Sequence, residues 1–78
     1  MTLEQMRRLH KQQPFEQFFI HLADGRSVRV GHPENLVFSG LGRTVVVFDG
    51  DDYEEIFDLL LVTSLRLVKR KPPAQNGG

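Results

Sequence analysis

The pair Asp24-Gly25 and the apolar residues around it constrain the fold of this chain most, because an Asp-Gly pair between two apolar runs is typical of a β-hairpin. A two-residue turn at this pair would place Ile20 opposite Arg29, and would bury an arginine or expose an isoleucine. A loop that begins one residue earlier places Ile20 opposite Val28, so that the apolar residues of both strands share one face. We therefore predict a three-residue loop with a positive φ at Gly25.

The N-terminal residues favour a short helix. Thr2 and Gln5 have the spacing of a capping box, in which each side chain accepts a hydrogen bond from the other residue's backbone N–H. Pro14 disfavours a helical conformation at Gln13, so the helix should end by about residue 12. Its narrow apolar stripe must dock on the rest of the protein. The stripe consists of Leu3, Met6 and Leu9.

Further strands are expected after the hairpin, separated by turns rich in glycine, proline and aspartate. They cover residues 36–38, 44–48, 53–57 and 63–68, and a helical turn capped by Asp58 is expected before the last of them. The strand 44–48 is apolar on both faces, which a one-sided sheet would not require. We expect a helix, another wall of a barrel or another subunit to cover its second face.

Length and composition favour one small domain over residues 1–68, followed by a basic tail, 69–78, that we expect to be disordered. The chain has 78 residues and no cysteine, so it can form neither a disulfide nor a cysteine-ligated metal site. It has no signal-peptide pattern and no apolar run long enough to cross a membrane. We expect a cytoplasmic protein without a membrane partner.

The charged residues are unevenly distributed although the formal net charge is zero. Residues 34–58 contain seven acidic side chains and one basic side chain, whereas residues 59–78 contain four basic side chains and no acidic one. Basic residues near both ends form a candidate interaction surface that could contact phosphates if the two ends lie together. The zero net charge, and the lack of aromatic residues interleaved with these bases, argue against nucleic acid as the partner. The candidate residues are Arg7, Arg8, Lys11, Lys69, Arg70 and Lys71.

No motif in the sequence indicates catalysis or a cofactor. The acidic turn from Asp49 to Asp52 could hold a hard cation, but Asp and Gly are also ordinary turn residues, and we favour a plain hairpin there. The histidines His10, His21 and His32 do not have the spacing of a zinc site. No serine stands in a nucleophile elbow, and no glycine-rich segment matches a phosphate loop. We expect neither enzyme activity nor a bound cofactor.

The order of these elements favours a mainly β fold, a small SH3-like or Sm-like barrel of about five to six short antiparallel strands with one N-terminal α-helix. The ordered chain also resembles a family of short bacterial proteins of unassigned function, and this resemblance implies no activity. The residues that carry it are Pro14, Phe15 and Phe18 and the segments 20–26, 32–34, 42–47 and 58–65.

A second, weaker resemblance concerns layout alone. A helix followed by about five strands, with an Asp-Gly turn after a hydrophobic strand, is similar to the Sm-like fold, which includes a bacterial RNA chaperone. This resemblance implies assembly into a ring and RNA binding. The chain departs from the Sm pattern at Val30, where that pattern has a glycine, and at Pro33, which interrupts the second Sm strand.

The apolar residues in 45–48 and 59–62 exceed what so small a core can take up, and exposed apolar patches mark interfaces. We therefore expect a non-enzymatic interaction module that associates with itself or with a protein partner. The alternative function is that of an Sm-like ring subunit that binds RNA. A further alternative, in which the helix stripe covers the excess apolar surface, also remains open.

Overall fold

The computed structural model describes residues 2–39, 41–49 and 53–68. Its elements confirm the predicted mainly β fold with one N-terminal helix. They are α1 (Leu3–His10), β1 (Phe18–Leu22), β2 (Ser27–Val30), η1 (Pro33–Asn35), β3 (Leu36–Phe38), β4 (Thr44–Asp49), β5 (Tyr53–Asp58), η2 (Leu59–Leu61) and β6 (Val62–Leu67), where η1 and η2 are 3₁₀ turns. The tail predicted over 69–78 lies outside the described residues.

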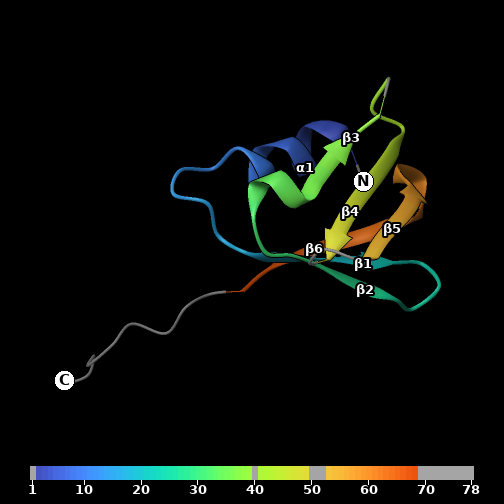
Figure 1. The fold of residues 1–78 in the computed structure, drawn as a ribbon. Helices are drawn as coiled ribbons and strands as arrows, with labels where there is room; N and C mark the ends of the chain where they lie inside the picture. Colours follow the sequence, from blue (N-terminus) through green and yellow to red (C-terminus); the bar gives the residue numbers. More distant parts are fainter. Residues whose placement is uncertain (1, 40, 50–52, 69–78) are drawn as a thin grey trace.

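The six strands of the described residues form two antiparallel sheets of three strands each. Sheet A has the order β2–β1–β6, and sheet B has the order β3–β4–β5. Figure 1 shows sheet A along the lower side of the molecule, with the strands of sheet B above it and α1 beside β3. Strand β1 is therefore the central strand of sheet A, between β2 and β6.

The β1–β2 hairpin has the predicted register. Ile20 pairs with Val28 and Phe18 pairs with Val30. The loop is closed by hydrogen bonds from the Gly25 N–H to the Leu22 carbonyl (3.0 Å) and from the Leu22 N–H to the Arg26 carbonyl (2.9 Å). Gly25 has a φ of +95°, as predicted for the residue that ends a three-residue loop. The burial of the apolar side chains on one face thus decides the register.

The predicted helix signals are also present in the structure. The Gln5 N–H donates to Thr2 Oγ1 (3.2 Å), and the Thr2 N–H donates to Gln5 Oε1 (3.1 Å), so the capping box is complete. Of the predicted stripe, Met6 is fully buried and Leu9 packs against the core. Asp58 caps η2 by accepting a hydrogen bond from the Leu60 N–H (2.8 Å).

The core lies between the inner faces of the two sheets and is closed by α1. Sheet A and sheet B both contribute alternate residues, as expected of sheets that are buried on one face. The side chain of β1 residue Phe18 is among the largest that are fully buried. The buried core consists of Met6, Phe18, Ile20, Leu22, Val30, Leu36, Val45, Val47, Phe57 and Val62.

Within residues 2–39, 41–49 and 53–68, the strand 44–48, predicted to be covered on two sides, is covered on one side only. Val45 and Val47 face the core, whereas Val46 and Phe48 alternate with them and face outward. Phe48 is 37% exposed. Met6 of α1 lies in the core with Val45 and Val47. The apolar stripe of the helix therefore faces the inner side of sheet B and does not cover the outward-facing Val46 and Phe48.

Candidate interaction surfaces

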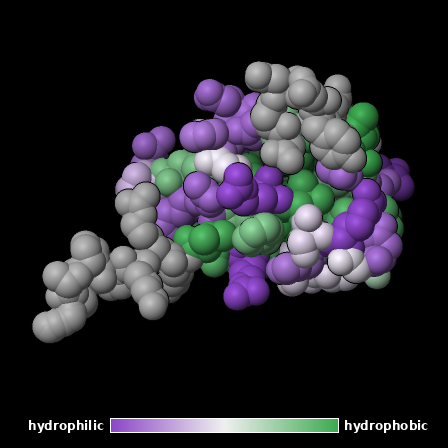
Figure 2. All heavy atoms as spheres, turned by 60° about the horizontal axis from the view of Figure 1, so that its bottom comes forward, coloured by the Kyte–Doolittle hydropathy of each residue, from purple (hydrophilic) through white to green (hydrophobic). Residues whose placement is uncertain are grey.

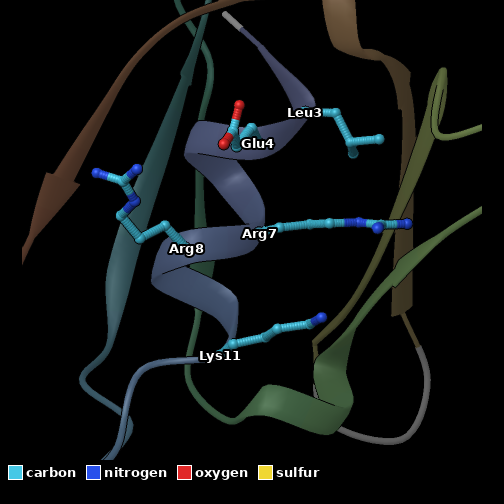
Figure 3. A pocket seen from close by; sticks show the side chains of 5 residues that line it. All are labelled: Leu3, Glu4, Arg7, Arg8 and Lys11. Atoms are coloured by element: carbon cyan, nitrogen blue, oxygen red, sulfur yellow. The ribbon is translucent and has the colours of Figure 1, made fainter.

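Three residues of the predicted basic surface fall within the described part of the chain. Arg7, Arg8 and Lys11 lie on or directly after α1, and all three are exposed. Figure 3 shows Arg7 and Lys11 on one side of the helix, together with Leu3, and Arg8 on the other. These residues and Glu4 line an open hollow of about 690 Å³. The predicted members Lys69, Arg70 and Lys71 lie outside the described residues.

Arg7 is held against the sheet and is not simply a solvated charge. Its Cζ atom lies 5.6 Å from the centroid of the Phe38 ring, within the range of a cation–π interaction. His10 contacts the same ring edge-on at 5.7 Å, and His10 Nε2 lies 2.7 Å from the carbonyl oxygen of Pro33, to which it donates. Both side chains thus fasten α1 to β3 and η1, which is a structural role.

The outer face of sheet B carries a continuous apolar row across all three strands. Val46 pairs with Val37 on one side and with Ile56 on the other. Val37 is 46% exposed and Ile56 is 62% exposed. Phe48 lies on the same face, two residues further along β4. We call these four residues the apolar row.

The outer face of sheet A differs in chemistry. Phe19 pairs with Arg29 of β2 and with Arg66 of β6, so that an aromatic ring is flanked by two exposed arginines. In the next row, His21 pairs with Ser27 and with Ser64. We call the six residues the Arg-Phe-Arg face. Figure 2, which brings this side of the molecule forward, shows strongly hydrophilic atoms around small apolar areas.

Contacts within this face hold its central side chains in place. The rings of Phe19 and His21 are nearly parallel, at an angle of 21° and a centroid distance of 6.5 Å. His21 Nδ1 is hydrogen-bonded to Ser27 Oγ at 2.9 Å. Among the described residues, neither Arg29 nor Arg66 forms an ion pair. Both guanidinium groups therefore keep their donors available to a ligand.

The Arg-Phe-Arg face was not among the surfaces predicted from the sequence, and its two arginines are not members of the predicted basic surface. Phe19 lies between two arginines because β6, more than 40 residues away in sequence, pairs with β1. The alternation of inward and outward residues in 18–22, 27–30 and 63–68 was visible in the sequence. The strand order that aligns them was not.

The hairpin loop carries a small ion-pair network that ties sheet A to sheet B. Arg26 donates to Asp24 Oδ2 (2.9 Å) and to Glu55 Oε1 of β5 (2.8 Å). The Arg26 backbone N–H also donates to Asp24 Oδ1 at 3.1 Å. This backbone hydrogen bond is the main reason that the pKa of Asp24 is lowered, and the Arg26 side chain lowers it further.

Two further groups of residues were considered as metal sites in the sequence. The acidic turn from Asp49 to Asp52, for which a plain hairpin was favoured, falls mainly on residues 50–52, which lie outside the described residues. Within residues 2–39, 41–49 and 53–68, no three side chains of the metal-binding types come together. The three histidines lie on separate elements, and α1, with eight residues, leaves no described helix long enough to cross a membrane.

No family model, curated protein or solved structure matches this chain.

Proposed function

We propose that this chain is a non-enzymatic interaction module that associates with a second copy of itself through the apolar row of sheet B. The observation that carries the proposal is the exposure of Val37, Phe48 and Ile56 side by side on one sheet face. Scattered exposed apolar residues are ordinary, but a contiguous group across three strands marks an interface.

A second copy fits this surface better than an unlike partner does. A two-fold axis through the row would place the same apolar residues against each other, which needs no complementary surface elsewhere. Sheets that pack face to face lie about 10 Å apart with interdigitated side chains, and such packing suits the branched side chains of Val37, Val46 and Ile56. The second cover that strand 44–48 requires would then come from another subunit.

We also propose a fold class, a cellular location and a family for this chain. Sheets A and B form two walls of an SH3-like or Sm-like barrel, supported by the return of β6 to β1 and by the 3₁₀ turn η2 directly before β6. The chain is a cytoplasmic member of the family of short bacterial proteins that its sequence resembles.

Light scattering coupled to size-exclusion chromatography tests the proposal. We expect twice the mass of a single chain for the wild type and a monomer for Ile56→Glu, because a carboxylate would be buried in the apolar contact. The matched control is Leu41→Glu, at a residue that is 96% exposed and outside the row, and it should remain a dimer. A wild type that is still monomeric at about 1 mM would overturn the proposal, since its association would then be weaker than about −4 kcal/mol.

A further inference from the structure

We propose that the Arg-Phe-Arg face of sheet A binds single-stranded RNA. This inference is independent of self-association, because sheet A and the apolar row of sheet B are different surfaces. It also requires no ring of subunits. It rests on the combination of stacking surface, positive charge and hydroxyl groups on one open sheet.

The aromatic component comes from β1. Phe19 and His21 project from the same face of the central strand, half-buried, with their rings nearly parallel. The His21–Ser27 hydrogen bond and the contact between the two rings limit the motion of the side chains before a ligand arrives. Unpaired bases stack on such rings, whereas bases within a duplex are not accessible to them.

The charge of the face complements a phosphate backbone. Arg29 and Arg66 flank Phe19 on neighbouring strands, which places their Cβ atoms about 5 Å from that of Phe19. None of the six side chains on this face is acidic, although the whole chain has as many acidic as basic residues. A base stacked on Phe19 would therefore have a guanidinium group on each side for its phosphates.

The second row of the face favours RNA over DNA. Ser27 and Ser64 flank His21, so hydroxyl and imidazole groups lie next to the stacking surface. A ribose 2′-hydroxyl can both donate to and accept from such groups, and deoxyribose has no equivalent.

Fluorescence anisotropy with a labelled uridine oligoribonucleotide and the full chain tests the inference. We expect a Kd of the order of 10⁻⁵ M at low salt. Phe19→Leu, which keeps an apolar side chain, should weaken binding about tenfold through loss of stacking. The double variant Arg29→Gln with Arg66→Gln should also weaken RNA binding. It should reduce the magnitude of the negative slope of log K against log salt by about 1.4, because two phosphate contacts are lost.

The matched control removes the same charge from α1. Arg8→Gln with Lys11→Gln should leave both the affinity and the salt slope unchanged, because these residues are not on sheet A. Thermal melting of each variant shows whether it is folded. The inference is overturned if the wild type does not bind at low salt, if the α1 variant loses as much affinity as the sheet A variant, or if a deoxythymidine oligonucleotide or polyglutamate binds as tightly as the RNA.

Discussion

The loop of the β1–β2 hairpin allows the free energy of one backbone conformation to be measured. Gly25 has a φ of +95°, and a Cβ atom added there would meet nothing within 4 Å. A substitution to alanine therefore changes the backbone energy without creating a clash. Left-handed backbone conformations cost a non-glycine residue about 1–2 kcal/mol. Alanine also lowers the entropy of the unfolded chain, which returns about 0.4–1 kcal/mol.

We therefore expect Gly25→Ala to destabilise the protein by about 1 kcal/mol, which lowers Tm by about 4–8 °C in a domain of this size. Gly31 supplies the matched control, because an added Cβ is equally free of contacts and its φ lies outside the left-handed region. Gly31→Ala should gain about 0.4–1 kcal/mol from the unfolded-state effect alone.

Differential scanning calorimetry or urea unfolding followed by circular dichroism measures these differences. A synthetic chain with D-alanine at position 25 completes the comparison, since D-residues favour positive φ and this chain should be at least as stable as the wild type. The reasoning is refuted if Gly25→Ala is as stable as Gly31→Ala, or if D-alanine and L-alanine at position 25 give the same Tm.

Three further predictions concern single contacts. Thr2→Ala removes the helix cap and should cost about 1 kcal/mol in urea unfolding, while Thr2→Ser should be near wild type. Asp24→Asn should be less stable than wild type at pH 7. Because folding lowers the pKa of Asp24 from its ordinary value of 3.8, the ionised carboxylate stabilises the fold at pH values above 3.8, and this effect is lost as the pH falls through the folded pKa. The difference in stability between the wild type and Asp24→Asn should therefore shrink below about pH 4. An unchanged difference in acid would contradict this prediction. Asn35→Ala removes the hydrogen bond from Asn35 Nδ2 to the Phe48 carbonyl (2.9 Å) and should cost about 1 kcal/mol, against no change for Glu34→Ala.

Local signals in the sequence were sufficient for the elements and for the hairpin register. The pairing of Ile20 with Val28 follows from the need to keep apolar residues on one face, and Gly25 follows from the loop length that this pairing requires. The caps at Thr2 and Asp58 depend on residues two or three positions away. Such features depend on residues that are close together in the sequence, so they can be predicted from a single sequence.

The candidate surfaces required information that local patterns do not contain. The alternation in the strands assigned Phe19 and Arg66 to outward positions, but only the pairing of β1 with β6 makes them neighbours. Likewise, the two apolar faces of strand 44–48 indicated a second cover but not that the helix would dock elsewhere. The order of strands in a sheet depends on how the whole domain packs, and the alternation of residues within a single strand does not determine it.

The central position of β1 has a consequence for the time at which this protein can fold. Phe18 pairs with Leu67, so one edge of β1 remains unpaired until nearly all of the described chain has been synthesised. A nascent chain that has not yet exposed β6 would present this strand to other chains, and pairing over so long a separation in sequence closes slowly. Pairing of β6 with β1 therefore closes an edge that is otherwise open to strands of other chains.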